Sequence, residues 1–288
     1  MRRGWSLLSH ERRIEQALLV SALSSVFILG LIIVFIFFEG LPAFRAAGIT
    51  GLLGGLRWAP TKSAFGILPM IAGSLWVTLG ALTLGAPVGV LCAVFLADFA
   101  PARIADITRV SVQMLAAIPS VVFGFIGLIF VVPFIRQYIG GPGFSVLASS
   151  IVLGVMILPT VVSISLDAIE SLPRSYKEGA MALGATRWQV VSMVTLPSAR
   201  SGILAAIILG MGRALGETMA VIMVAGNSLK IPTGLLAPVR TLTSGIALEM
   251  GYAEGLHRQA LFAMGIVLMA LILVLNLVAS AVARGRSR

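Results

Sequence analysis

The chain has 288 residues, 58% of them hydrophobic and only 11% charged, and its mean hydropathy is +1.04. This composition excludes an ordinary soluble domain and is typical of a protein that crosses a membrane several times. The formal net charge of +10 would suggest a nucleic-acid partner in a soluble chain. Here the basic residues stand at the edges of apolar segments instead, so we expect no nucleic acid to bind.

The sequence lacks the residues expected for a disulfide, a metal site or an ATP-binding P-loop. Cys92 is the only cysteine, so no disulfide can form within the chain. His10 and His257 are far apart in the sequence and have no cluster of ligand residues nearby, so no metal site is expected. No G-x-x-x-x-G-K-[ST] loop occurs, so the chain has no P-loop with which to bind ATP.

Six apolar segments are each long enough to cross a bilayer, which takes about 20 residues. The first follows a basic stretch at residues 1–16, but it is too long for a signal peptide and lacks a small-x-small cleavage site, which predicts an uncleaved anchor. Pro87, Pro119 and Pro159 fall inside spans and predict kinks that neighbouring helices can accommodate. The predicted spans are residues 17–38, 71–97, 110–135, 144–166, 201–225 and 260–283, followed by a basic tail at 284–288.

The sequence therefore predicts an all-α integral membrane domain over residues 17–283. With the N-terminus inside, the inner loops and ends carry more Arg and Lys than the outer ones, which predicts that both termini and the polar segment at about 170–199 are cytoplasmic. The long loops at 39–61 and 226–259 then face outward. An apolar stretch at 241–250 in the second loop predicts a short helix at the outer mouth. We interpret that loop either as a partner surface or as a simple lid.

The cytoplasmic segment at about 170–199 has the pattern of two short helices joined at a glycine. Ser175 and Glu178 have the S-x-x-E spacing of a capping box, which predicts a helix that begins just after Arg174. Gly184 can adopt the left-handed conformation that ends such a helix.

A second helix is predicted to follow the glycine. Thr186 and Gln189 offer a second capping box, and Leu196-Pro197 is predicted to close this helix before the next span. A rigid elbow of this kind in a loop of a membrane protein predicts a docking site for a partner.

This elbow resembles the EAA loop of ABC-importer permeases, whose pattern is E-A-A-x3-G-x9-I-x-L-P. Gly179 replaces the first alanine and Val194 the isoleucine, whereas the glycine, leucine and proline fall at the expected positions. The resemblance implies a type I, MetI-like permease fold with six transmembrane helices, docked on two copies of an ATPase subunit that binds the ATP and Mg²⁺. Asp98, in the short inner loop after the second span, is interpreted as solvated, with contact to the ATPase as the alternative. The residues implied in ATPase coupling are Tyr176, Glu178, Ala180, Gly184, Ala185 and Thr186.

Two opposite charges, Arg213 and Glu217, lie near the middle of the fifth predicted span. A charge at the bilayer centre costs about 2.5–3.5 kcal/mol on insertion scales, and the i,i+4 spacing predicts that the two pair across one helical turn. Gly212 and Gly216 predict close approach of another backbone on one flank. In one interpretation Arg213 lines the translocation route and binds an oxyanion, with Glu217 partly neutralising it. In the other the pair is a buried structural bridge.

The charged stretch resembles the permeases of the phosphate-specific ABC importer. Residues 212–221 read G-R-A-L-G-E-T-M-A-V, and this continuation with Gly226-Asn227 is similar to the PstC type rather than its PstA-type partner. Residues 65–69 and 118–122 are similar to that type too. The resemblance covers roughly residues 63–283.

That resemblance implies import of inorganic phosphate by alternating access across a bacterial or archaeal plasma membrane. It implies a PstA-type permease as heterodimer partner, an ATPase dimer and an external phosphate-binding protein. It also associates Arg213 and Glu217 with phosphate passage. Thr218 is a further candidate for the pathway, with a hydrogen bond back to its own helix as the alternative.

Other functions are weighed against this one. Arg213 would serve any oxyanion, so the physics alone leaves sulfate and molybdate open as substrates. A proton-coupled carrier acting alone suits an intramembrane charge pair, but it has no use for the elbow, and the chain shows no internal repeat. An intramembrane hydrolase is disfavoured because neither histidine lies in a span and no second acidic residue completes a dyad. We therefore expect a transporter subunit and not an enzyme.

Overall fold

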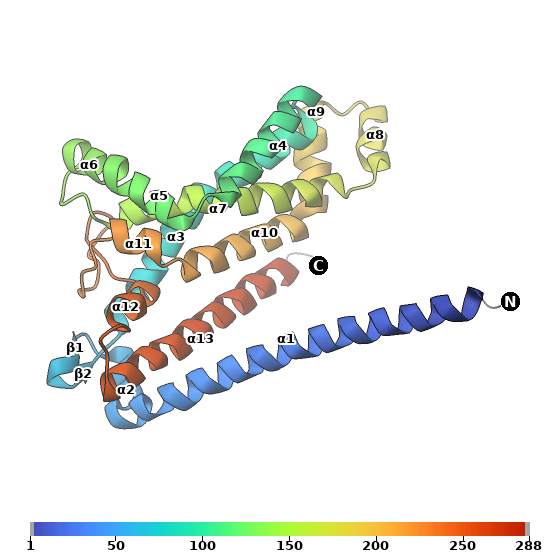
Figure 1. Cartoon of the computed structure of the whole chain (residues 1–288). Helices are drawn as coiled ribbons and strands as arrows, with labels where there is room; N and C mark the ends of the chain where they lie inside the picture. Colours follow the sequence, from blue (N-terminus) through green and yellow to red (C-terminus); the bar gives the residue numbers. More distant parts are fainter. Residues whose placement is uncertain (1–2, 286–288) are drawn as a thin grey trace.

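The computed structural model describes the backbone of residues 3–285 and the side chains of residues 14–281. This part of the chain is helical apart from loops and one two-stranded hairpin (Figure 1). Residues 1–2 and 286–288, at the ends of the predicted N-terminal segment and basic tail, lie outside it. Six of the described helices are long and apolar enough to cross a membrane, as predicted: Ile14–Ala47, Leu68–Asp98, Ser120–Ile139, Val146–Glu170, Arg187–Gly216 and Gly255–Ala281.

The elements are labelled as in Figure 1. The strands are β1 (Trp58–Ala59) and β2 (Ala64–Phe65), which pair antiparallel. Three π-helical turns, Gly127–Val131, Ile135–Ile139 and Val190–Thr195, continue neighbouring α-helices. The α-helices are α1 (Arg3–Ala47), α2 (Ile49–Gly54), α3 (Leu68–Asp98), α4 (Ala102–Ala117), α5 (Ser120–Ile126), α6 (Val132–Phe134), α7 (Val146–Glu170), α8 (Arg174–Ala182), α9 (Arg187–Gln189), α10 (Leu196–Gly216), α11 (Met219–Val224), α12 (Leu242–Glu249) and α13 (Gly255–Gly285).

Helix α7 is the centre of the bundle and packs along α3 and α10. It is the most buried of the six spans, with 61% of its apolar window buried against 39% for α3. The contact with α3 is close because small residues face it: a Cβ at Gly85 would lie only 2.5 Å from the carbonyl oxygen of Gly154. The most buried part of the bundle therefore lies along α7.

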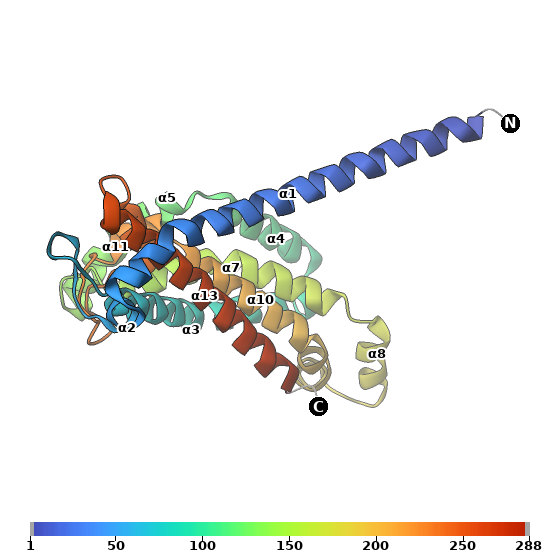
Figure 2. The same cartoon turned by 90° about the horizontal axis from the view of Figure 1, so that it is seen from below.

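The C-terminal part of α1 packs on α13, and its N-terminal part extends away from the bundle, as Figure 2 shows. Phe35 and Phe262 meet edge to face at 5.5 Å, and a Cβ at Gly40 would lie 2.7 Å from the side chain of Ile266. None of the apolar window of α1 is buried within the described chain. Its surface is therefore available to lipid or to another membrane protein.

The third span differs from the prediction of one helix over residues 110–135 with a kink at Pro119. Helix α4 ends at Ala117, Ile118 and Pro119 are extended with ψ of 128° and 140°, and a new helix begins at Ser120. The residue before a proline is disfavoured in the helical region, so the chain breaks here instead of bending. Pro87 and Pro159 lie inside continuous helices.

The bundle has two distinct ends (Figure 1). At the hairpin end lie β1, β2, α2, α11 and α12, and α12 confirms the short helix predicted in the loop at 226–259. At the elbow end α8 projects from the bundle, and α1 begins and α13 ends toward this same side. The two candidate sites of the sequence lie at the elbow and at the junction of α10 with α11.

Candidate functional site

The first elbow helix, α8, forms at the predicted place but is not capped as predicted. It begins at Arg174 after Pro173, whose φ of −56° suits a helix start, and no side chain caps it. Ser175 therefore already lies in the first turn, and a capping hydroxyl must precede that turn in extended conformation. The predicted Ser175–Glu178 capping box is wrong.

The glycine and the second cap of the elbow are confirmed. Gly184 has φ of +85°, and Ala185 N donates to the carbonyl of Ala180 at 3.1 Å, which closes the end of α8. The Thr186 hydroxyl accepts from the backbone of Gln189, whose side chain accepts from the Thr186 backbone in return. The turn between α8 and α9 is thus fixed by local hydrogen bonds.

The second elbow helix does not end at Leu196-Pro197, so that prediction is also wrong. Helix α9 passes through the π-helical turn Val190–Thr195 directly into α10, and Thr195 and Leu196 keep helical dihedrals. Local π geometry is one of the adjustments by which a membrane helix accommodates a proline. The second half of the elbow and the fifth span are one continuous helical element.

The elbow presents apolar side chains to its surroundings. Tyr176 is 52% exposed, Met181 48% and Leu183 91%. Sequence reasoning missed Met181 and Leu183, although a leucine at the end of a short polar helix is a usable signal. Exposed apolar groups on a projecting helix are typical of a protein–protein contact.

Two ion pairs tie the elbow end to the bundle. Lys177 Nζ of α8 lies 2.5 Å from Asp98 Oδ1 at the end of α3, with both side chains largely buried. Asp98 is therefore not a solvated loop residue. Arg109 of α4 makes a two-pronged contact with Glu170 at the end of α7. The hydrogen bond to Glu170 raises the pKa of Arg109 above its ordinary value, so this guanidinium stays charged.

The fifth span breaks where the sequence predicted one helix over 201–225. Helix α10 ends at Gly216, Glu217 is extended with ψ of 134°, and α11 begins at Met219. The Glu217 carboxylate accepts from Ala220 N at 3.3 Å, and the Glu217 carbonyl accepts from the Thr243 hydroxyl at 2.8 Å. These bonds replace helical ones, so the break is satisfied within the protein.

Arg213 and Glu217 do not form the predicted pair. Within the described residues Arg213 Nη1 donates to Thr160 Oγ1 of α7 at 3.3 Å, and no ion pair joins it to Glu217. The i,i+4 argument fails because the helix ends between the two residues. Arg213 is half-buried, and its partner is a neutral hydroxyl. Sequence reasoning missed Thr160, whose signal is a hydroxyl next to Pro159 in mid-span.

The remaining candidates of this stretch have modest roles in the structure. The Thr218 hydroxyl donates to the carbonyl of Gly216 at 3.2 Å, which is the local backbone bond foreseen as the alternative. A Cβ at Gly212 or Gly216 would meet no atom within 4 Å, so the predicted close approach of a backbone is absent from the described chain. Arg213, Glu217 and Thr218 thus lie together at one helix break, with Thr160 beside the first.

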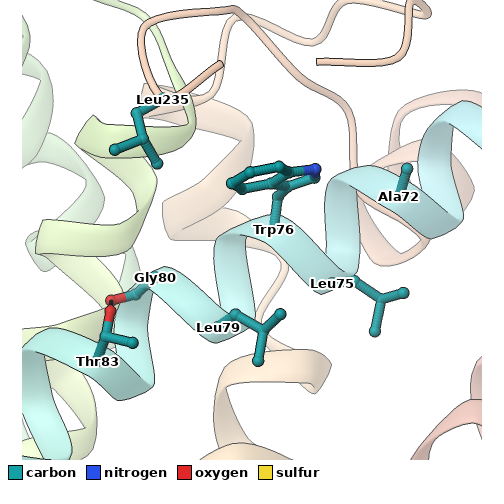
Figure 3. Close-up of a pocket in the computed structure, with 7 residues that line it drawn as sticks. All are labelled: Ala72, Leu75, Trp76, Leu79, Gly80, Thr83 and Leu235. Carbon is teal, nitrogen blue, oxygen red and sulfur yellow. Dashed lines mark hydrogen bonds between the residues drawn. The ribbon is translucent and has the colours of Figure 1, made fainter. Parts of the chain in front are cut away.

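An apolar pocket lies elsewhere, on α3. It encloses about 450 Å³ along α3 beneath Leu235, and Figure 3 shows Trp76 at its centre. Its lining has no charged side chain, so it does not suit an anion. No group of three or more His, Cys, Asp or Glu residues able to hold a metal ion occurs in the described part of the chain.

A bundle of six apolar helices, a projecting elbow and a half-buried arginine at a helix break define a multi-pass membrane permease. Residues 85–288 match the family described as binding-protein-dependent transport system inner membrane component. The chain belongs to this family, and it is a permease of the ABC-importer class, as the EAA resemblance predicted.

Relatives and solved structures agree with this assignment. The chain is 43% identical over 245 residues to the probable ABC transporter permease protein YqgH of Bacillus subtilis, covering 83% of this chain and 79% of that protein. It is 36% identical over 232 residues to the phosphate transport system permease protein PstC of Haemophilus influenzae, covering 73% of each. A bacterial alginate ABC transporter solved with an alginate-bound periplasmic protein matches with a TM-score of 0.68 at 20% identity, over 94% of this chain and 95% of that one. The predicted all-α permease fold is confirmed.

Proposed function

We propose that this permease carries inorganic phosphate. The observation that carries the proposal is Arg213, a guanidinium in mid-bundle whose side-chain partner in the described chain is the neutral hydroxyl of Thr160. Its other donors are available to an oxyanion, which guanidinium groups bind in two-pronged geometry. The relative named as a phosphate permease points to phosphate among the oxyanions.

Thr160 completes the donor set. Its oxygen accepts from Arg213, which leaves the hydroxyl proton free to donate to the same anion. The Glu217 carboxylate accepts a hydrogen bond from Ala220 N and so stabilises the helix break. It also places a negative charge four residues after Arg213. A weak contact set of this kind suits a transport path, because the anion must also leave.

We assign a different partner to each end of the permease. The exposed Tyr176, Met181 and Leu183, with the exposed Glu178 of α8, dock an ATPase subunit that binds ATP and Mg²⁺. Ala180 and Gly184 to Thr186 hold the elbow in shape for it. The hairpin end receives an external phosphate-binding protein, and a PstA-type permease completes the pair. We place both termini in the cytoplasm; the supporting observation is that α1 begins and α13 ends toward the elbow (Figure 1).

The transport cycle uses alternating access. Closure of the ATPase dimer displaces α8, and the displacement reaches the bundle through α7 and through the continuous element of α9 and α10. The helices rock, and a path opens past Arg213 to the hairpin end. No step requires chemistry on the anion.

The test is uptake of labelled phosphate into membrane vesicles that contain the co-expressed permease pair and ATPase, together with the binding protein. Uptake is measured with and without ATP on the elbow side, and with excess sulfate or molybdate as competitor. We expect strict dependence on ATP and no competition by either anion. Competition by sulfate or molybdate would reassign the substrate. Uptake by this chain alone, driven by a proton gradient, would overturn the mechanism.

A further inference from the structure

Glu249 is a buried carboxylate at the hairpin end, and its two oxygens contact three side chains. It lies at the end of α12 and is only 7% exposed. Its Oε1 accepts from Arg240 Nη1 at 2.6 Å, and its Oε2 accepts from Trp58 Nε1 at 2.8 Å and lies 2.8 Å from His257 Nε2. A buried carboxylate is costly unless its oxygens are paired, and here both are.

The three donors come from three different segments. Trp58 belongs to the external hairpin, Arg240 to the loop that precedes α12, and His257 to the first turn of α13. The Trp58 and His257 rings also meet edge to face at 6.0 Å. Arg240 further donates from Nε to the carbonyl of Asn227, just beyond α11. Glu249 thereby joins the hairpin, the loop and α13 into one body.

The other end of α12 reaches the helix break of the fifth span. The Thr243 hydroxyl donates to the Glu217 carbonyl at 2.8 Å, and Leu242 N donates to Ser74 Oγ of α3 at 2.9 Å. Glu249 lies six residues after Thr243, about 9 Å farther along the helix. A rigid helix thus connects the carboxylate to the backbone of the charged stretch.

We propose that Glu249 is a positioning residue for transport. Through α12 and Thr243 it fixes the break at Glu217 relative to the external hairpin, so that displacement of the hairpin by a docked binding protein reaches the stretch that carries Arg213. Coupling between sites needs a contiguous element that both sites bias, and α12 is that element. This inference rests on the proposed function, because it takes the break as part of the pathway.

Two variants interrupt the connection at different points. Glu249→Gln keeps the shape of the side chain but removes its charge, which weakens the bonds from Arg240 and Trp58. Thr243→Val removes the hydroxyl that holds the Glu217 carbonyl and leaves Glu249 untouched. Thr243→Ser keeps the hydroxyl and is the matched control.

The readout is the ratio of stimulated to basal ATPase activity in vesicles that hold the full complex, with phosphate-loaded binding protein as the stimulus. We expect Glu249→Gln and Thr243→Val each to lower this ratio on the order of tenfold, the factor for loss of one strong hydrogen bond, while Thr243→Ser stays near the parent. An unchanged ratio in both variants would overturn the proposal. A loss of both activities in proportion would also overturn it, because that result indicates only a structural role.

A second measurement is independent of which residues line the path. In a Cys92→Ala background, spin labels at the exposed positions Lys62 and Lys230 report the distance between hairpin and loop in the complex at rest. We expect a narrow distribution of distances in the parent and a broad one in Glu249→Gln. Equal distributions would overturn the proposal that Glu249 joins the hairpin to the loop. Failure of the proposed function would show separately, as absence of phosphate-dependent stimulation in the parent complex.

Discussion

Arg213 and Thr160 face each other across the contact between α10 and α7, with Arg213 Nη1 donating to Thr160 Oγ1 at 3.3 Å. The bond brings together residues 53 positions apart in the chain. It gives Arg213 a neutral partner in place of the carboxylate that the sequence suggested. An anion bound here meets a donor from each of two helices, and that arrangement can be tested from both sides.

Thr160→Val removes the hydroxyl and keeps the shape of the side chain. We expect the KM for phosphate uptake to rise on the order of tenfold or more with kcat nearly unchanged, because a hydrogen bond to a charged group contributes about 1.5–3 kcal/mol. Thr160→Ser should behave like the parent. Equal KM values for the valine and serine variants, from initial rates of uptake, would remove Thr160 from the path.

Arg213→Met removes the guanidinium while leaving the elbow intact. We expect phosphate uptake to fall by about 100-fold, since more than one charge-assisted hydrogen bond is lost. Retention of the ATPase during purification should be unchanged, because Arg213 lies far from α8 along α10. Normal uptake by this variant would contradict the role given to Arg213.

Asp98→Lys places two cations at the junction of α3 and α8. We expect lower thermal stability of the purified complex and weaker uptake, and partial recovery in the double variant Asp98→Lys with Lys177→Asp, which restores the opposite charges. The side chains are 12% and 23% exposed, so the coupling should be about 1 kcal/mol. A double variant no better than the single one would show that this ion pair does not join the elbow to α3.

Leu183→Glu tests the apolar tip of the elbow. Because Leu183 is 91% exposed, the stability of the permease should change by less than about 0.5 kcal/mol. We expect the amount of ATPase that copurifies to fall about tenfold, since a charge would enter an apolar contact. The control is Leu183→Ile. Full ATPase retention by the glutamate variant would place the docking contact elsewhere.

The two glycines of the elbow should respond in opposite directions to alanine. Gly184→Ala strains a residue with φ of +85° and should cost about 1 kcal/mol of local stability, seen as faster amide exchange over residues 180–186. Gly179→Ala lies inside α8 with open space around its Cβ, and alanine should favour the helix by about 1 kcal/mol. If Gly184→Ala were as well protected as the parent, the left-handed turn would not be what holds the elbow.

Local patterns predicted those parts of the fold that depend on neighbouring residues alone. The spans, the left-handed Gly184 and the Thr186–Gln189 capping box all arise from spacing within a few residues. The Ser175–Glu178 box has the same spacing and still failed, because the helix begins at Arg174, two residues too early for Ser175 to cap it. Spacing alone does not say which residue the chain uses as the helix start.

The contacts that define the site could not be predicted because they join distant parts of the chain. Lys177 and Asp98 are 79 positions apart, and Trp58 and Glu249 are 191 apart. The break at Glu217 depends on a hydroxyl from α12, which no helical periodicity of the fifth span reveals. The two charges were therefore correctly placed in one region but wrongly paired.

The continuity of α9 with α10 has a consequence for how the elbow works. Thr160 lies on α7, which leads into α8, and Arg213 lies on α10, which α9 continues without interruption. The turn at Gly184 joins α8 to α9, and Thr160 is ten residues, or about 15 Å, from the end of α7. The helices that enter and leave the elbow therefore carry the two residues of the proposed anion contact. We expect a partner that displaces the elbow as one body to move α7 and α10 together, and so to act on the contact between Thr160 and Arg213.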